Sequence, residues 1–417
     1  MKLKQIRVDG YKNLINCVVN LGDFNVLVGP NNSGKSNLLE ALHVLGLIAF
    51  GSPEDRKSIL RGHTPLRRIG FSISHLVEHK DKPITVGITF EKVVDDILWV
   101  GDYAVTIRCA PSEDAKGTIV SETLKGKPYG RKGPATKHIS RKKEQFSILT
   151  RSGGKRQHRI TQDNSSLSAL PSLYADPQEL PPELVEFYYA VRWLARTPIF
   201  ALSPSELRRE IDKDTPIGDF WVSGFDLGLV LDNIKEEGTY YELFTESMCD
   251  MVAIENIHLH VEVKKAPSKK AESNGTEKRI RCIIVERRGD SPSLIEEYSD
   301  GTLVIAAILA ALCFKKRRGP ILCLEELETC LHPAALEKLL RFLRGHSDKW
   351  PVLITTHSPY LLNCVNPEDV NVAVVDETGA VTFKKVRNTK QLRDYLKSGF
   401  MSFGDMLASN FEDVLGK

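Results

Sequence analysis

Residues 29–36 read Gly-Pro-Asn-Asn-Ser-Gly-Lys-Ser, and an apolar run from Phe24 to Val28 leads directly into them. The two glycines of this pattern let the backbone curl so that successive N–H groups point at an anion. The lysine can reach the outer phosphates of a nucleotide, and the last serine supplies a hydroxyl for Mg²⁺. The pattern predicts a phosphate-binding loop formed by Gly29, Asn31, Asn32, Ser33, Gly34, Lys35, Ser36 and Asn37.

The residues at 36–45, Ser-Asn-Leu-Leu-Glu-Ala-Leu-His-Val-Leu, place apolar side chains at helical spacing. A loop between an apolar strand and a helix is the setting in which this glycine pattern binds phosphate. The sequence therefore predicts an α/β fold with a nucleotide site near its amino end.

Two adjacent carboxylates end a second apolar run, Pro320-Ile-Leu-Cys-Leu-Glu-Glu326. A strand that ends in two acids is typical of a Walker B element. In this interpretation Glu325 holds Mg²⁺, and Glu326 orients or deprotonates the attacking water.

Two further elements carry candidate phosphate contacts. His357 ends the apolar run Val352-Leu-Ile-Thr-Thr356, where a switch residue can contact the γ-phosphate. Upstream, Ser299, Asp300 and Gly301 open a helix-like run, and a serine hydroxyl with N–H groups at a helix start can bind an anion. The sequence predicts a second phosphate contact there.

In this order, the four elements resemble the ABC-type ATPases of the SMC, RecF and OLD (overcoming lysogenisation defect) group. Residues 325–333, Glu-Glu-Leu-Glu-Thr-Cys-Leu-His-Pro, and 355–359, Thr-Thr-His-Ser-Pro, are similar to segments of OLD-like ATPases. The resemblance implies an ABC-type P-loop core, a mixed sheet flanked by helices, with ATP and Mg²⁺ as cofactors. It also implies a homodimer or higher homo-oligomer in which Ser299, Asp300 and Gly301 of one subunit contact the ATP held by another.

Some residues depart from the family pattern. Glu325 stands where most relatives have Asp, although OLD-like members usually carry Glu there, and Leu327 replaces a proline. No glutamine occurs between Gln5 and Gln145, so the expected Q-loop residue is missing or replaced, with Ser72, Ser74 and His75 as candidates. In the resembling families the Leu-His-Pro piece shapes a helix start, which predicts a structural or interface role for His332.

Periodicity divides the chain of 417 residues into four stretches. Residues 1–60 form the amino-terminal ATPase part, with short strands expected at its edge, and residues 61–180 form an antiparallel β region. Residues 181–260 form a helical lobe, and residues 261–417 complete the ATPase lobe after a hairpin at 264–278. Without sustained heptads, the insertion between the loop and Walker B is expected to be a compact β-rich and helical lobe and not a coiled coil.

Composition excludes several classes of protein. The eight cysteines include no Cys-x-x-Cys pair, which argues against a zinc site or a disulfide framework. No apolar run is long enough for a membrane span, and the first residues are typical of a strand rather than a signal peptide. We expect a cytoplasmic protein without a membrane partner.

The net charge is only +3, but residues 121–160 contain twelve basic residues and two acidic ones. This stretch shows little helical or strand periodicity. Either it tracks a phosphate backbone, with Arg141, Lys142 and Lys143 in the contact surface, or it is a solvated surface loop.

The family resemblance favours a regulatory ATPase that controls a separate effector, a nuclease, as stand-alone OLD-like ATPases do in bacterial anti-phage defence. The 60 residues after His357 are too few for the Toprim nuclease domain of full OLD proteins. A RecF-like DNA-clamping repair ATPase and a nucleotide-gated scaffold with negligible turnover are the alternatives.

Overall fold

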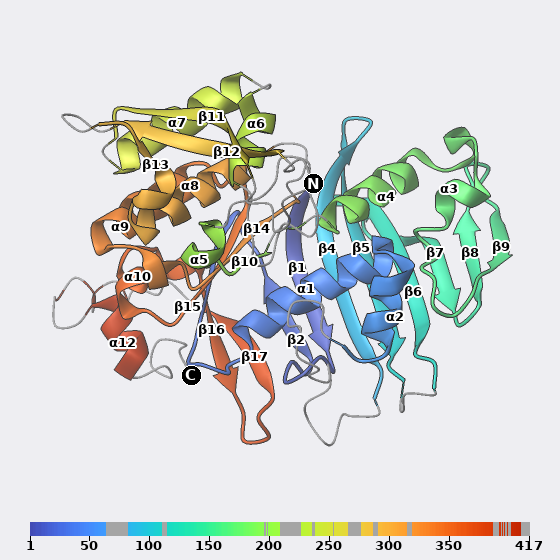
Figure 1. Ribbon diagram of the computed structural model, residues 1–417. Coiled ribbons are helices and arrows are strands. Elements are labelled where there is room, and N and C mark those ends of the chain that lie inside the picture. The colour runs from blue at the N-terminus through green and yellow to red at the C-terminus, as the bar shows by residue number, and fades with distance from the viewer. Residues whose placement is uncertain are drawn as a thin grey trace. The chain divides into compact units, whose positions relative to one another are not determined.

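Figure 1 shows the computed structural model of the protein. It describes the chain apart from residues 64–81, 111–114, 196, 198, 209–226, 236–237, 253, 266–276, 287–290, 315–318, 387–391, 393, 395, 397, 399–401 and 410–417. The chain forms two units. The first comprises Met1–Thr197, Gly319–Cys323 and Ser347–Lys417, and the second comprises Pro198–Arg318 and Leu324–His346.

An eight-stranded antiparallel sheet, in the order β2-β1-β4-β5-β6-β7-β8-β9, forms much of the first unit. Its strands alternate buried and more exposed residues, because successive side chains of a strand point to opposite faces. The strands are β1 (Lys2–Asp9), β2 (Cys17–Asn20), β4 (Ile84–Val94), β5 (Ile97–Arg108), β6 (Thr118–Pro128), β7 (Thr136–Lys142), β8 (Gln145–Leu149) and β9 (Lys155–Arg159).

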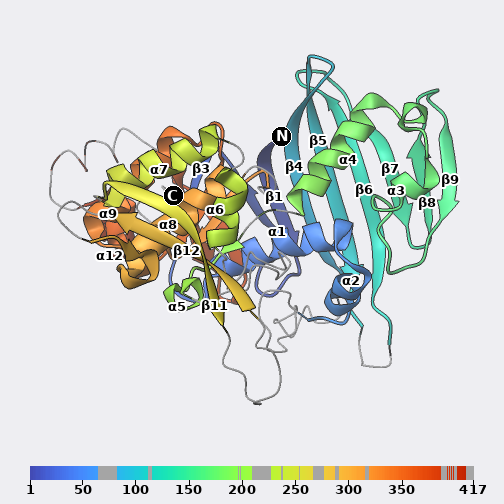
Figure 2. The same ribbon diagram turned by 45° about the horizontal axis from the view of Figure 1, so that its top comes forward.

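Helices of the first unit cover the apolar face of this sheet, and Figure 2 shows α1 and α4 running across it. The helices are α1 (Lys35–Phe50), α2 (Pro53–Leu60), α3 (Leu170–Leu173), the 3-10 turn η2 (Pro177–Glu179) and α4 (Pro182–Leu194). Phe187 of α4 meets Phe90 of β4 edge to face at a centroid distance of 5.4 Å. Gly101 and Gly126 lie under these two rings, where a Cβ atom would collide with the aromatic carbons.

The second sheet has the order β10-β14-β15-β3-β16-β17. Its β3 (Phe24–Val28) pairs in parallel with both β15 (Val352–Thr356) and β16 (Val370–Val375), and all five residues of β3 are buried. A strand buried on both faces needs the continuous apolar run that this sequence has. The remaining strands are β10 (Ile199–Phe200), β14 (Leu322–Glu325) and β17 (Val381–Lys385), and the helices that follow β15 are α10 (Pro359–Asn363), η6 (Pro367–Asp369) and α12 (Phe403–Ser409).

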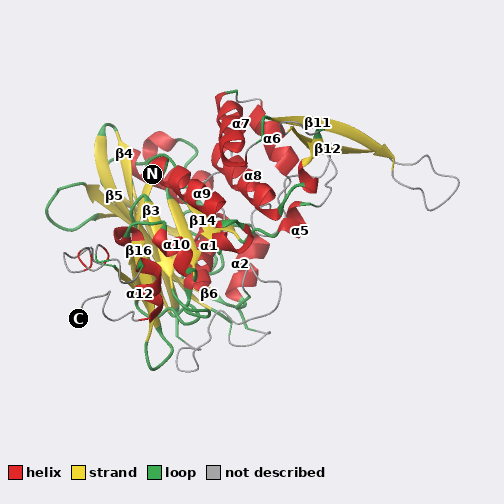
Figure 3. Cartoon of the chain, turned by 90° about the vertical axis from the view of Figure 1, so that its left-hand side faces the viewer, coloured by secondary structure: helices red, strands yellow, loops and turns green. Residues whose placement is uncertain are grey.

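The second unit is built around α8 (Asp300–Cys313), whose residues from Thr302 to Cys313 are all buried. Figure 3 shows α6 and α7 beside it, together with the long β11–β12 hairpin. The amphipathic α9 (Pro333–Gly345) buries leucines 336, 339, 340 and 343 on one face. The other elements are α5 (Pro204–Leu207), α6 (Leu227–Lys235), α7 (Thr239–Val252), β11 (Asn256–Lys265), β12 (Glu277–Glu286), β13 (Ser293–Leu294), η3 (Ile295–Glu297) and η5 (Leu327–Cys330).

The structure corrects two expectations. The first strands do not all form an edge, because β1 lies between β2 and β4 and β3 lies between β15 and β16. Residues 121–160 are not an irregular loop but contain most of β6 and all of β7, β8 and β9. Arg141 lies in the core, where its fully buried guanidinium pairs with buried Glu122 at 3.7 Å, so it is no part of a contact surface.

His138 of β7 is buried among aromatic rings, 5.6 Å from the ring of Phe187 and 6.4 Å from that of Trp99, centroid to centroid. Neither of its ring nitrogens has a hydrogen-bond partner among the described residues. Burial lowers the pKa of His138 from 6.5 to about 4. The imidazole is therefore neutral in the folded protein at neutral pH.

We expect His138 to weaken the fold in acid. Between pH 6.5 and about 4 the unfolded chain binds a proton at this residue that the folded protein excludes. The free energy of unfolding therefore falls as the pH drops through that window, by about 3 kcal/mol at most from this residue. Urea unfolding of the wild type and of His138→Leu across the window measures the effect, since all other groups titrate in both proteins. If the free energy of unfolding depends on pH in the same way in both proteins, His138 is not the residue that weakens the fold in acid.

Candidate nucleotide-binding site

The predicted phosphate loop lies between β3 and α1 in the first unit. Gly29 has no room for a side chain, because a Cβ atom there would lie 2.6 Å from Ser33 Oγ and 2.8 Å from the Cβ of Ala373 on β16. Gly34 has a φ of 80° and occupies the N-cap position of α1 without a side-chain cap. The first N–H groups of α1 thus point into the loop without a capping side chain, which suits a phosphate.

Lys35 is buried at the mouth of the loop. Its ammonium donates to the carbonyl oxygens of Gly29 at 2.7 Å and of Pro30 at 2.9 Å. The positive charge is therefore held within the curl of the loop, where the outer phosphates of a nucleotide are expected. These residues fit the nucleotide that the sequence predicts.

The turn between β1 and β2 is hydrogen-bonded to the phosphate loop and to α1, and this contact was not predicted from the sequence. Asn13 accepts a hydrogen bond from the side chain of Asn37 at 2.7 Å and donates to the carbonyl of Asn32 at 3.2 Å. Lys12 forms a buried ion pair with Glu40 of α1. The available signal was Glu40 itself, a charged residue at a position where the helix pattern requires burial.

His357 lies next to the phosphate loop because of strand register. Thr356 at the end of β15 pairs with Val28 at the end of β3, and the two strands are parallel. Their next residues, His357 and Gly29, therefore leave the same edge of the sheet from neighbouring strands. The side chain of His357 is exposed there, which agrees with a switch role.

The two predicted carboxylates lie in the second unit, after the chain crosses from one unit to the other within β14 between Cys323 and Leu324. Glu325 is partly buried, and Glu326 is exposed. Glu326 has a φ of 46° and lies in the left-handed region, which a residue with a side chain enters at a cost. Such strain is a common feature of catalytic positions.

Ser299, Asp300 and Gly301 also lie in the second unit, at the start of α8. Ser299 caps this helix, and its Oγ accepts from the N–H of Thr302 at 3.3 Å. Asp300 pairs with Arg208 at 2.5 Å, and Arg208 also donates to the carbonyl of Tyr298 at 3.0 Å. Gly301 packs on the segment after Walker B, since a Cβ atom there would lie 3.1 Å from the carbonyl oxygen of Cys330.

The structure therefore brings the predicted residues together in two groups. The loop and His357 share the first unit, and the carboxylates and the serine–aspartate–glycine segment share the second. Arg208 was not predicted, because nothing in the sequence links it to Asp300. His332 has the predicted structural role, since its Nδ1 caps α9 by accepting from the N–H of Ala334 at 3.3 Å.

The Q-loop candidates Ser72, Ser74 and His75 lie outside the described residues. Within the described part of the chain, no three His, Cys, Asp or Glu side chains gather as a metal site, and no helix is long and apolar enough to cross a membrane.

The strand β3 leads through a glycine-rich loop into α1, and His357 follows the parallel neighbouring strand β15. This is the arrangement of a P-loop ATPase of the ABC type. The family model described as "AAA domain, putative AbiEii toxin, Type IV TA system" matches residues 149–363, which is more than half of the chain. A second model, described as "AAA ATPase domain", matches residues 1–167. The chain belongs to the first of these families.

Individual relatives agree with this assignment. The DNA replication and repair protein RecF of Staphylococcus carnosus is 31% identical over 90 residues, which are 21% of this chain and 24% of that protein. RecF of Staphylococcus haemolyticus is 30% identical over the same lengths. The chain thus matches about a quarter of its RecF relatives. An SMC head solved with the C-winged helix domain of ScpA is 15% identical over 94% of this chain and all of its own, with a TM-score of 0.50, and shows the same fold.

Strain at Glu326 predicts a measurable gain in stability. Glycine enters the left-handed region freely, so Glu326→Gly should unfold at a higher urea concentration than Glu326→Ala. We expect its free energy of unfolding to be larger by roughly 1 kcal/mol. Both variants lose the carboxylate, so the comparison isolates the backbone. If Glu326→Ala is as stable as Glu326→Gly, the left-handed conformation is not imposed on this residue.

Proposed function

We propose that the protein binds ATP with Mg²⁺, hydrolyses it, and dimerises around it to control a separate effector, a nuclease. The proposal rests on one observation above all: the register that sets His357 beside the phosphate loop at the ends of β15 and β3. A buried lysine, uncapped helix N–H groups and an exposed histidine then share one edge of a sheet, which is the chemistry that a triphosphate needs.

In this proposal each residue has a separate role. Lys35 binds the β- and γ-phosphates, and Ser36 and Glu325 hold Mg²⁺, which neutralises charge on the phosphate oxygens. Glu326 orients the attacking water and accepts its proton. His357 contacts the γ-phosphate and senses its loss.

Dimerisation is proposed because the start of α8 is exposed at Ser299 and Asp300. Arg208 holds Asp300 in place, and the cap fixes the direction of Ser299. A fixed, exposed helix start is able to contact a phosphate held by a second copy. The family description names a putative toxin of a toxin–antitoxin system, which supports a role in such a system. Control of a separate effector is our inference from the resemblance to OLD-like ATPases.

A RecF-like role in clamping DNA is the second candidate. Exposed cations on β7, β9 and their turns favour it, together with the RecF relatives; these cations include Lys137, Lys142, Lys143, Arg151 and Lys155. These cations also have a structural explanation, because charged side chains on an edge strand prevent it from pairing with other strands. Stimulation of ATP turnover by DNA, lost at high salt, would favour this candidate over control of an effector.

We expect Lys35→Ala and Lys35→Met to weaken ATP binding by roughly tenfold to a hundredfold, because each loses a charge-assisted contact to phosphate. Glu326→Gln should keep affinity within a few-fold but slow hydrolysis by about 10²–10⁴. Calorimetry and phosphate release measure the two effects, with exposed Lys349→Ala as the control. Wild-type turnover by Glu326→Gln would remove Glu326 from the mechanism and leave a nucleotide-gated scaffold to be tested.

The composite site predicts complementation between two inactive variants. Ser299→Asp keeps a helix-capping side chain but sets a carboxylate against phosphate, so it should fold and fail to hydrolyse ATP. Mixed with Lys35→Ala, it should recover roughly a quarter of wild-type turnover, because half of the dimers are mixed and each keeps one intact site of two. Full wild-type turnover by a protein that sediments as a monomer would exclude a signature acting between subunits.

A further inference from the structure

The first unit contains a cavity of about 1000 Å³ that none of the nucleotide-binding residues line. Four segments bound it: the end of α2, the chain entering β6, the turn between β7 and β8, and the stretch that begins at the last residue of β9. Four cations line it, Lys57, Arg61, Lys116 and Arg159, together with the carboxylates of Glu144 and Asp163. The lining therefore has an excess of two positive charges.

The cations and the carboxylates of this cavity differ in their partners. Glu144 accepts a hydrogen bond from Gln162 at 2.9 Å, and the neighbouring side chain of Thr161 lowers the pKa of Asp163. None of the four cations forms an ion pair within 4.0 Å with a described carboxylate, although Lys57 acts on Asp163 at longer range. All four are exposed and available to an anion.

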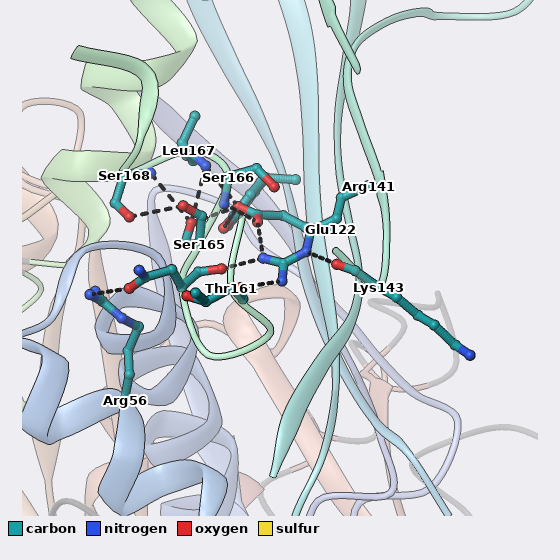
Figure 4. Close-up of polar contacts among 11 residues, drawn as sticks. Arg56, Glu122, Arg141, Lys143, Thr161, Ser165, Ser166, Leu167 and Ser168 are labelled. Atoms are coloured by element: carbon teal, nitrogen blue, oxygen red, sulfur yellow. Dashed lines mark hydrogen bonds and ion pairs between the residues drawn. The ribbon is translucent and has the colours of Figure 1, made fainter. Parts of the chain in front are cut away.

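One wall of the cavity is held rigidly by a buried polar network, shown in Figure 4. The guanidinium of Arg141 donates to the carbonyl oxygens of Thr161 at 3.0 Å and Lys143 at 2.6 Å, and also to that of Asn164. Arg56 of α2 donates to the side chain of Asn164 at 3.1 Å. These bonds fix residues 161–164 and tie them to α2.

Glu122 anchors the same network from β6. It accepts from Ser165 Oγ at 2.7 Å and from the N–H of Ser166 at 2.6 Å, beside its ion pair with Arg141. It also accepts from Tyr103 at 2.9 Å, and burial raises the pKa of this phenol well above its ordinary value, so it stays a donor. Every oxygen of the buried carboxylate is therefore occupied.

The opposite wall is equally fixed. The carbonyl of Leu60 at the end of α2 accepts from the N–H of Ala110 at 2.8 Å, and Gly117 lies so close to it that no side chain fits there. The N–H of Ile119 on β6 donates to the carbonyl of Gln162 at 2.8 Å, and this bond joins the two walls. A cavity with pre-organised walls loses little entropy when a ligand binds.

We propose that this cavity binds a small phosphorylated ligand of nucleotide size, separate from ATP in the phosphate loop. The arginines and lysines bind its phosphate, since a guanidinium matches two phosphate oxygens at once. Ile160, which is half-buried in the lining, offers apolar surface to a base or another ring. The volume matches that of small-molecule sites. Cations grouped around a cavity are better suited to a compact anion than to a continuous nucleic-acid backbone.

The test uses the full chain carrying Lys35→Ala, so that competition from the phosphate loop is reduced. Pyrophosphate, ADP, GDP, CDP and UDP are titrated separately by calorimetry. We expect one of them to bind once per chain, and Lys116→Glu with Arg159→Glu to weaken it on the order of a hundredfold, because two charge-assisted contacts become repulsive. The matched control, Lys142→Glu with Lys143→Glu, reverses two exposed cations outside the lining and should change affinity less than twofold.

Lys57→Glu with Arg61→Glu, on α2, gives an independent second variant in case the first misfolds. The proposal is overturned if no probe binds, if the pocket variants bind like the control, or if only a single-stranded oligonucleotide binds. ATP hydrolysis enters none of these measurements. The result is therefore independent of the proposed ATPase function.

Discussion

The parallel pairing of β3 with β15 and β16 is the constraint on which the nucleotide site depends. Parallel strands deliver their next residues to one edge of a sheet, so Gly29 and His357 emerge side by side although more than 300 residues separate them. On the other side, Ala373 of β16 lies so close that only glycine fits at position 29. The sheet therefore determines which residues meet at the loop, and it leaves no room for a side chain at position 29.

The turn between β1 and β2 adds a second constraint on α1. A buried ion pair such as Lys12–Glu40 contributes little net stability, since desolvation offsets most of its attraction. Its effect here is positional, because it fixes the helix relative to the turn from which Asn13 reaches Asn32 and Asn37. The ion pair and these hydrogen bonds therefore tie the helix and the loop to the same turn.

The expectation that residues 121–160 form one irregular basic surface was wrong for a physical reason. The sequence of residues 121–160 does not separate a buried cation from an exposed one, yet Arg141 is enclosed while Lys142 and Lys143 beside it are exposed. In a strand, adjacent residues point to opposite faces, so Arg141 meets Glu122 while Lys142 points away, and Lys143 already lies in the turn after β7. A stretch that suggested one basic surface therefore contains a structural arginine and a set of surface cations.

The sequence by itself determined the strand–loop–helix of residues 24–45, the strand at 352–356 and the helix start at His332, because these follow from residues adjacent along the chain. Tertiary structure alone decided the pairing of Arg208 with Asp300, 92 residues away, and the cavity lined by α2, β6 and the segment after β9. It also decided the left-handed backbone of Glu326. Such features depend on which distant segments pack together, and hydrophobic periodicity reports the buried face of each segment but not its partner.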